Sequence, residues 1–258
     1  MRVLFGLAFL LECLCSAAFA AELSVASWNI HKGHNWEVVA RAMHEPPLAE
    51  ADVIALQEVL TNEEGRQGQR LARIFGGRAI VVGRDVILSR LPVADFGEVR
   101  VNPATGRRAA WADLRVAPGK TVRVYSVHLS YKVKKSPFIP DTRKEEMQRV
   151  LLHASGFPGP VVIAGDYNTV GWIVCCQENA PLLSMLEENG YSDATAGSPG
   201  RTQLWTGKVD WIFAKGLSAA SSRRGRYAGS DHRWLLSVFT PVPDASPAPL
   251  NKAAGIVK

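Results

Sequence analysis

The sequence predicts an α/β fold in which helices are layered on a mixed β-sheet. Short apolar runs of strand length alternate with segments of helical spacing along most of the 258-residue chain. Two strands, Ala109–Val116 and Thr121–His128, are separated by a turn that contains Pro118-Gly119, which is typical of an antiparallel hairpin. Because the hairpin occurs together with helical crossovers, the sequence predicts a mixed sheet rather than a purely parallel one.

The elements before this hairpin alternate between strands and helices. Leu23–Ile30 and Asp52–Gln57 are apolar runs that predict strands, and a helix is expected between them at Glu37–Glu50. Gln67–Phe75 has helical spacing. Strand-like runs then follow at residues 79–82, 86–88 and 93–101.

The elements after the hairpin continue the alternation. Arg143–Ala154 has the pattern of an amphipathic helix and leads to a short apolar strand at Val161–Ala164. A further helix is expected at Ala180–Asn189, and strands are expected at 208–213 and 234–239. No repeat or linker interrupts this order, so a single domain is predicted over residues 21–240.

The two ends of the chain differ from this domain. Arg2 precedes the apolar run Val3–Leu11, and Ala18-Phe19-Ala20 is a small-x-small cleavage pattern, so residues 1–20 predict a secretory signal peptide. The apolar run is shorter than the roughly 20 residues that a membrane-spanning helix needs. We therefore expect an exported protein, periplasmic or secreted, with a flexible tail rich in Pro and Ala at residues 241–258.

Charge and cysteine content narrow the class of partner. The formal net charge is +6, and it stays +6 without residues 1–20, which hold one Arg and one Glu. A basic exported protein is drawn to polyanions such as nucleic acid or acidic lipid surfaces. The remaining cysteines, Cys175-Cys176, are adjacent, and adjacent cysteines bridge only through a strained ring. No disulfide framework is therefore expected.

Polar residues follow several of the predicted strands. Asp166 and Asn168 come directly after the Val161–Ala164 strand, and alternate residues of an extended chain share a face, so both can reach one cleft while Tyr167 points away. Asn29, Glu58 and His128 likewise end or follow predicted strands, Asp210 lies inside the apolar strand at 208–213, and Asp231 and His232 lead into the last strand. Each alone is explained by a cap, a surface position or an ion pair. Together they supply oxygen ligands for a divalent cation, two imidazoles and an Asp–Asn pair, which metal-assisted hydrolysis of a phosphate ester requires.

Six motifs in this order resemble those of the endonuclease/exonuclease/phosphatase superfamily. They are Trp28-Asn29-Ile30, Leu56-Gln57-Glu58-Val59, Val127-His128-Leu129, Gly165-Asp166-Tyr167-Asn168, Val209-Asp210-Trp211-Ile212 and Ser230-Asp231-His232. The resemblance extends over Leu23–Phe239. It implies a four-layer α/β sandwich of the deoxyribonuclease I type, with two mixed β-sheets packed face to face, helices on the outside and an active site at one end.

The resemblance also implies a role for each site residue. Glu58 would be the principal Mg²⁺ ligand, with Asn29 and Asp231 beside it, and Mn²⁺ or Ca²⁺ could replace Mg²⁺. Asp166 would orient or deprotonate the attacking water, and Asn168 would position the phosphate or that water. His232 would bond to the scissile phosphate or exchange protons, held in its tautomer by Asp210. His128 resembles the first of two histidines in the deoxyribonuclease I and sphingomyelinase branches, and the sequence identifies no carboxylate to orient it.

The first functional hypothesis is an exported, Mg²⁺-dependent phosphodiesterase that acts as a DNase-like endonuclease. The basic loops around Arg107-Arg108 and at Tyr131–Lys135 could grip a phosphate backbone, although solvated basic loops would have the same composition. No long apolar insertion suited to a bilayer is evident, so nucleic acid is favoured over a lipid headgroup. No aromatic–basic interleaving of the kind found in single-strand stacking surfaces is evident either. The alternatives are a sphingomyelinase-like phospholipase, a phosphatase, or a catalytically silent binding domain. We expect a monomer without an obligate protein partner.

Overall fold

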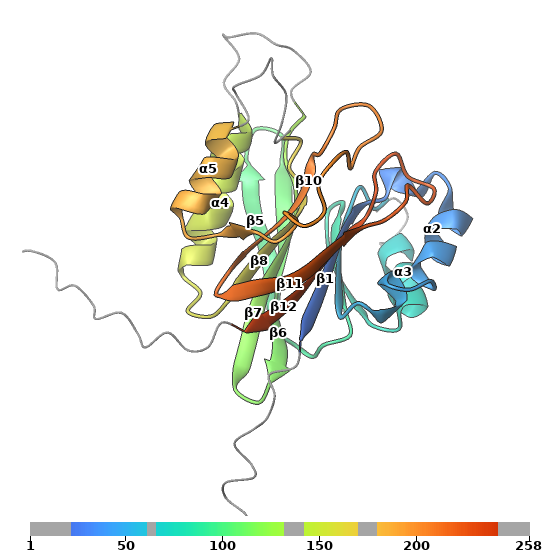
Figure 1. Ribbon diagram of the computed structural model, residues 1–258, viewed down its shortest axis with the longest axis horizontal. Coiled ribbons are helices and arrows are strands. Elements are labelled where there is room, and N and C mark those ends of the chain that lie inside the picture. The colour runs from blue at the N-terminus through green and yellow to red at the C-terminus, as the bar shows by residue number, and fades with distance from the viewer. Residues whose placement is uncertain (1–21, 61–65, 132–141, 170–179, 242–258) are drawn as a thin grey trace, which may run out of the picture.

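The computed structural model describes residues 22–60, 66–131, 142–169 and 180–241 (Figure 1). Several features predicted from the sequence lie outside these ranges: the signal peptide at residues 1–20, the basic segment 132–135, Cys175-Cys176, and residues 242–258 of the tail. Within the described ranges, no helix is both long enough and apolar enough to cross a membrane.

Two six-stranded mixed sheets form the centre of the fold. The first, here called sheet A, has the order β11-β12-β1-β2-β4-β3. Its strands are β1 (Leu23–Asn29), β2 (Val53–Gln57), β3 (Arg78–Val82), β4 (Asp85–Ser89), β11 (Leu217–Arg224) and β12 (Leu235–Pro241). The second, sheet B, has the order β5-β6-β7-β8-β10-β9. Its strands are β5 (Val93–Asn102), β6 (Arg107–Ala117), β7 (Lys120–His128), β8 (Val161–Asp166), β9 (Ser192–Asp193) and β10 (Asp210–Lys215).

Helices cover the outer faces of both sheets (Figure 1). Those on the side of sheet A are α2 (Trp36–Met43) and α3 (Arg66–Phe75), with two 3-10 turns, η1 (His31–Gly33) and η2 (Leu48–Glu50). Those on the side of sheet B are α4 (Thr142–Ser155) and α5 (Ala180–Glu188). Three clusters of buried apolar side chains fill the three interfaces, one between the sheets and one beneath each pair of helices. The predicted four-layer α/β sandwich with mixed sheets is confirmed.

Some boundaries differ from the prediction. The helix expected at Glu37–Glu50 ends at Met43, because Pro46 and Pro47 interrupt it, and the chain resumes as the short turn η2. Strand β11 was not predicted, since its sequence is polar and it lies at the edge of sheet A, where outward side chains face solvent. Strand β12 extends through Pro241, so the predicted tail would begin one residue later, at 242.

Candidate active site

The strand registers bring three predicted site residues into one row across sheet B. β7 and β8 are parallel, with His128 beside Asp166, and β10 is antiparallel to β8, with Asp210 beside Asp166. Asp210 thus begins strand β10 rather than lying inside it, as the sequence suggested. The row depends on close strand contact at Gly165, where an added Cβ would lie 1.9 Å from the carbonyl oxygen of Val127.

The matching end of sheet A supplies Asn29 and Glu58. Asn29 ends β1 and lies in register with Gln57 of β2, so that Glu58 directly follows the paired strands. The side-chain Nδ2 of Asn29 donates to Glu58 Oε1 at 3.3 Å and to Asp166 Oδ2 at 3.0 Å. A buried amide therefore ties a carboxylate of sheet A to a carboxylate of sheet B. The Oδ1 of Asn29 accepts a hydrogen bond from the backbone N–H of His31. The predicted role of Asn29 as a metal ligand stays a prediction.

His232 enters the same site from the loop before β12. Its backbone N–H donates to Ser230 Oγ at 3.0 Å, and that hydroxyl donates to the carbonyl of Asn29 at 2.7 Å. The ring Nδ1 lies 2.8 Å from Asp210 Oδ2, and the Nε2 lies 3.8 Å from Asp166 Oδ2. The predicted Asp210–His232 pair is therefore formed, with the free ring nitrogen facing Asp166.

The surroundings keep His232 protonated. Burial disfavours the charged ring, but Asp210, by charge and hydrogen bond, together with Asp166 and Asp231, raises the pKa of His232 to about 10. Burial also raises the pKa of Asp166; His232 opposes this rise, and Asp210 adds to it. At neutral pH the pair thus places an imidazolium donor beside a buried carboxyl group that holds a proton more readily than usual.

His128 approaches Asp166 from the other side but has different neighbours. Its Nε2 lies 3.7 Å from Asp166 Oδ2 and 4.0 Å from Glu58 Oε1. Arg107 donates through Nη1 to the carbonyl oxygens of His128 and Leu129, at 2.6 and 3.1 Å. Burial lowers the pKa of His128 to about 4; Asp166 acts against this shift, and Arg107 adds to it. His128 is therefore a neutral imidazole at neutral pH.

Asn168 supports Asp166 from the loop after β8. Its backbone N–H donates to Asp166 Oδ1 at 2.9 Å, and its Nδ2 donates to the carbonyl of Leu129 at 2.9 Å. Tyr167 between them is fully buried and points away, as the alternation of side chains predicts. Asn168 and Glu58 both have positive φ, 48° and 57°, in the left-handed region that non-glycine residues seldom adopt. Such backbone strain is concentrated at functional sites.

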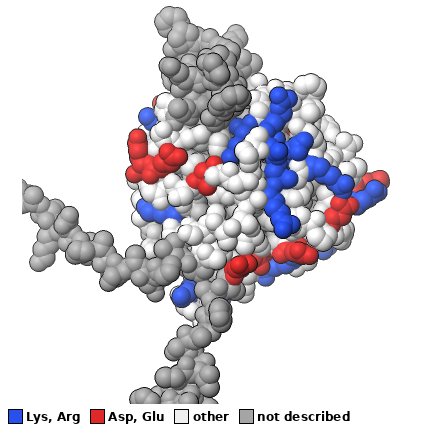
Figure 2. Space-filling model, viewed as in Figure 1, with Lys and Arg blue, Asp and Glu red and all other residues white. Residues whose placement is uncertain are grey.

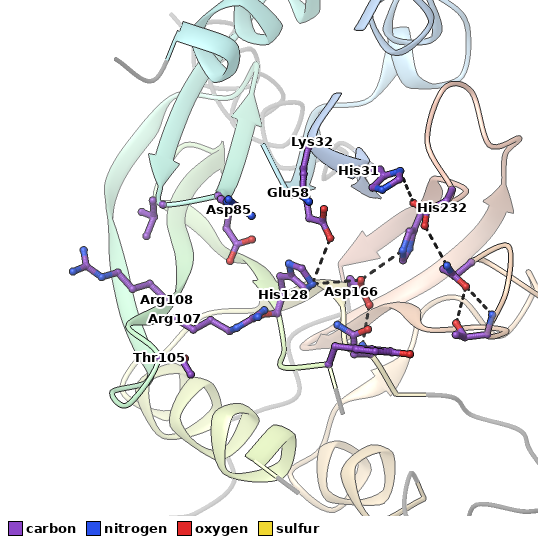
Figure 3. Close-up of a pocket in the computed structure, with 18 of the residues that line it drawn as sticks. His31, Lys32, Glu58, Asp85, Thr105, Arg107, Arg108, His128, Asp166 and His232 are labelled. Carbon is purple, nitrogen blue, oxygen red and sulfur yellow. Dashed lines mark hydrogen bonds and ion pairs between the residues drawn. The ribbon is translucent and has the colours of Figure 1, made fainter. Parts of the chain in front are cut away.

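These side chains open into a cleft of about 920 Å³ (Figure 3). Its acidic groups are Glu58, Asp85, Asp166 and Asp231. Its basic groups are Lys32, Arg84, Arg107 and Arg108. Arg107 and Arg108 lie on one wall in Figure 3, and His31 and His232 lie on the other. Basic groups around an acidic floor suit a ligand that brings both phosphate oxygens and a cation.

Asp85, at the start of β4, is a cleft residue that the sequence did not indicate. It is 3% exposed, and its Oδ1 has no hydrogen-bond partner within the described part of the chain. Burial raises the pKa of Asp85 well above its usual range, while Arg107 acts in the opposite direction. Figure 3 shows it beside Glu58 and His128, on the side of the cleft that holds Arg107. A buried, unpaired carboxyl beside other acids is costly unless a cation or a donor meets it.

Asp231 lines the same cleft beside His31. Its Oδ1 is 3.4 Å from His31 Nδ1, and its Oδ2 accepts a hydrogen bond from Gln203 Nε2 at 3.2 Å. The structure therefore gathers the eight predicted site residues at one end of the sandwich, six of them lining the cleft and Asn29 and Asp210 buried behind it. The catalytic and ligand roles assigned to them stay predictions.

A family model matches the part of the chain that contains these site residues. The model described as "Endonuclease/Exonuclease/phosphatase family" matches residues 26–232, which include all eight of these residues. The chain belongs to the endonuclease/exonuclease/phosphatase family. The resemblance inferred from the six motifs is confirmed.

The chain is similar to several known proteins at low sequence identity. A UPF0294 protein of Vibrio campbellii is 24% identical over 232 residues, which cover 85% of this chain and 78% of that protein. A family structure from Beutenbergia cavernae has a TM-score of 0.69 at 21% identity, covering 85% of this chain and 72% of that chain. D. rerio TDP2, complexed with single strand DNA product, has a TM-score of 0.64 at 16% identity, with 85% and 99% covered. The Bacteroides thetaiotaomicron mannosyl-6-phosphatase has a TM-score of 0.61 at 16% identity, and the match covers 84% of this chain and 99% of that chain.

Members of the endonuclease/exonuclease/phosphatase family typically hydrolyse phosphate esters with a divalent metal ion, and the residues present fit such an ion. Glu58, Asp85 and Asp231 line the cleft with hard oxygen atoms, and Asp85 Oδ1 has no hydrogen-bond partner among the described residues. Among the described residues, Asp166, Asp210 and His232 form the one compact group, with one ligand atom from each within 4.8 Å of the others.

Proposed function

We propose that the protein is a Mg²⁺-dependent phosphodiesterase that cleaves nucleic acid. One observation carries the proposal: Asp166 lies between the Nε2 atoms of two histidines, at 3.7 and 3.8 Å, on the floor of a cleft with a basic rim. The rim attracts a phosphodiester, and the floor places a base and two imidazoles around one point.

The chain's own residues account for the proton transfers. Asp166, buried and steadied by the backbone N–H of Asn168, accepts a proton from the attacking water. His232, held protonated by Asp210, donates to a phosphoryl or leaving oxygen as negative charge develops there. His128 is neutral and contributes one N–H to the same region. The three groups thus divide the work of base, acid and hydrogen-bond donor.

Glu58 would hold the Mg²⁺ ion, with Asp231 and Asn29 as further ligands, and the buried Asp85 carboxyl lies on the same side of the cleft. When bound, the ion would polarise a phosphoryl oxygen and offset charge in the transition state. Mn²⁺ and Ca²⁺ have the same preference for oxygen ligands and are the natural replacements to test.

Nucleic acid is the preferred substrate because four basic residues, Lys32, Arg84, Arg107 and Arg108, line the cleft, although Arg107 is bonded to backbone carbonyls and Arg108 pairs with Glu98. The fold shared with a TDP2 bound to a single-stranded DNA product supports the same choice. The fold shared with a mannosyl-6-phosphatase supports a second candidate, a phosphatase acting on a sugar phosphate.

One experiment separates these substrates. Residues 21–258 are incubated with plasmid DNA, single-stranded DNA, mannose 6-phosphate, sphingomyelin vesicles and a chromogenic phosphodiester, each with Mg²⁺ or with chelator. Nicked plasmid or shortened strands that require Mg²⁺ support the proposal. Free phosphate alone indicates the phosphatase, choline phosphate indicates the phospholipase, and silence on all five substrates indicates a binding domain.

Two variants test the assignment of the site. His232→Ala should abolish cleavage, and Glu58→Gln should weaken Mg²⁺ binding measured by calorimetry. The matched control is His153→Ala, which removes a histidine that pairs with Tyr125 outside the cleft. Cleavage that survives in His232→Ala would refute the proposed site.

We also propose that the protein acts outside the cytoplasm, on the basis of the N-terminal pattern of Arg2, the apolar run Val3–Leu11 and Ala18-Phe19-Ala20. Expression of the full chain, cell fractionation and N-terminal sequencing test this directly. The expected N-terminus is Ala21. A cytoplasmic protein that starts at Met1 would refute the proposal.

A further inference from the structure

A second cleft, separate from the one that contains His232, lies next to it on the surface. It has a volume of about 850 Å³ and is lined by four arginines, Arg223, Arg224, Arg226 and Arg233. We call it the arginine cleft. Figure 2 shows Lys and Arg gathered on the face of the molecule where Figure 1 places β11 and β12.

The charges in the arginine cleft are unbalanced. Among the described residues that line it, Glu45 is the one carboxylate, and it pairs with Arg226. Arg223 is exposed at the end of β11 and has no hydrogen-bond or ion-pair partner within the described ranges. The cleft therefore carries an excess of positive charge toward solvent, where an anion can reach it.

Three of the arginines are held in place before any ligand arrives. Arg224 donates to the carbonyl of Pro199, Arg226 pairs with Glu45, and the guanidinium of Arg233 lies 4.6 Å from the centre of the Tyr227 ring. The buried Nε of Arg233 and the buried hydroxyl of Ser222 have no hydrogen-bond partner in the described part of the protein. Fixed guanidinium groups with unused donors match the oxygens of a phosphate group.

Residues of one short bridge, here called the ridge, line both clefts. Gln203 and His232 form an isolated β-bridge, flanked by Arg233 N to Thr202 O at 2.7 Å and Leu204 N to Asp231 O at 2.9 Å. Consecutive residues of the ridge serve different clefts, because His232 lines the active site and Arg233 lines the arginine cleft. A ligand that crosses the ridge can occupy both.

The ridge also carries an exposed aromatic ring. Trp205 is 77% exposed and lines the active-site side. Its turn is braced by Gln203, whose Oε1 accepts the backbone N–H groups of Trp205 and Thr206, both at 2.7 Å. An exposed Trp on a braced turn presents a flat apolar surface on which a nucleobase can stack.

We propose that the arginine cleft is a second phosphate-binding site for a single strand of nucleic acid, which passes from the active-site cleft over Trp205 to Arg223 and Arg233. The inference rests on the proposed phosphodiesterase function and names the track of its substrate. A polymer fits because its phosphates repeat along one chain and its bases supply the rings for Trp205, whereas a free phosphate would use neither the ridge nor Trp205.

Binding is measured separately from cleavage. Fluorescence anisotropy of a labelled single-stranded oligonucleotide is recorded in chelator at several salt concentrations, with wild-type protein, Arg223→Glu and Arg223→Ala. The matched control is Arg115→Glu, an exposed arginine of β6 that lines neither cleft. Melting curves of all variants confirm that each one is folded.

Arg223→Glu should weaken oligonucleotide binding and lower the slope of log K against log salt by about 1, the effect of one lost phosphate contact. The difference from wild type should then shrink roughly threefold to fourfold between about 50 and 200 mM salt. Arg223→Ala should show a smaller loss, and Arg115→Glu should show none. Equal binding by Arg223→Glu and Arg115→Glu would overturn the inference.

Trp205→Ala tests whether the ligand is a nucleic acid. It should weaken oligonucleotide binding by about tenfold and leave polyphosphate binding unchanged, because polyphosphate has no bases to stack. Binding of anionic lipid vesicles that depends on Arg223, without oligonucleotide binding, would refute the inference and indicate a membrane surface instead.

The chromogenic phosphodiester keeps this inference distinct from the proposed function, because it is too small to reach the arginine cleft. If Arg223→Glu cleaves it like wild type but binds the oligonucleotide unchanged, the second site is refuted and the phosphodiesterase stands. If wild-type protein cleaves no phosphodiester at all, the proposed function fails whatever the binding data show.

Discussion

His128 and His232 approach the same carboxyl oxygen, Asp166 Oδ2, at 3.7 and 3.8 Å, yet the fold places them in opposite charge states. His232 has Asp210 behind its Nδ1, and its pKa is raised to about 10. His128 has the cation of Arg107 nearby, and its pKa is lowered by burial to about 4. Equal distances to a common partner therefore do not make two residues equivalent.

The contrast shows what a second layer of residues contributes to a site. Without Asp210, burial would push the pKa of His232 downward, as it does for His128. Asp210, together with the charges of Asp166 and Asp231, thus converts a neutral ring into an acid that is charged at neutral pH. The pair gives the cleft one acid and one neutral donor from the same residue type, which is the separation of roles that acid–base catalysis requires.

The largest expected effect comes from removing the carboxylate that distinguishes His232. Asp210→Asn should lower hydrolysis of the chromogenic phosphodiester by two to four orders of magnitude, because His232 loses its charge partner and its fixed tautomer. NMR of the chelator-treated protein should show that the pKa of His232 falls toward that of His128.

The control for this variant is Asp113→Asn, another buried carboxylate, which pairs with Arg123 in sheet B outside the cleft. It should cost stability but leave the rate per folded molecule close to wild type. A wild-type rate in Asp210→Asn would mean that His232 does not act as the acid.

A smaller effect on activity is expected from changing the surroundings of His128. Arg107→Gln removes the nearby cation and should raise the pKa of His128, measured by NMR in chelator. Activity should change by about tenfold or less, because a donor is weakened rather than lost. Arg107→Lys keeps the charge but cannot reproduce both carbonyl contacts, so it separates electrostatics from support of the loop. An unchanged pKa of His128 in Arg107→Gln would assign its low value to burial and to the remaining cations, His232 and Arg84.

The sequence predicted those parts of the protein that depend on local pattern. Alternating apolar runs predicted the strands, and motif order predicted that Asp166, Asn168, His128 and His232 would converge. It missed β11, because an edge strand with polar side chains lacks an apolar pattern, and it extended α2 past Met43 by discounting two prolines.

The parts that were missed depend on contacts between distant segments. Asp85 looks like a turn residue before an apolar run, and only the pairing of β4 with β2 places it on the floor of the cleft. Gln203 and His232 lie 29 positions apart and are paired by an isolated bridge, with Trp205 two residues after Gln203 and Arg233 directly after His232.

The smallest expected effect is on the free energy of unfolding, whose pH dependence has opposite signs for the two histidines. The raised pKa of His232 contributes stability that is complete below pH 6.5 and is lost as the pH rises toward about 10. The lowered pKa of His128 does the reverse: the unfolded chain binds a proton near pH 6.5, so stability falls as the pH drops from there to about 4. Urea unfolding across this range, in chelator, should show slopes of at most about 1.4 kcal/mol per pH unit for each histidine.

The variants that isolate these slopes are His232→Gln and His128→Gln, with His44→Gln at the exposed end of α2 as the control for loss of a histidine. The difference between wild type and His232→Gln should shrink as the pH rises above 7. The difference between wild type and His128→Gln should shrink, or change sign, as the pH falls below 6. The wild-type protein has the contributions of both histidines, so its stability should be highest between the pH range in which the His128 contribution is lost and the range in which the His232 contribution is lost. Slopes of the same sign for both histidines would show that their environments are not opposed.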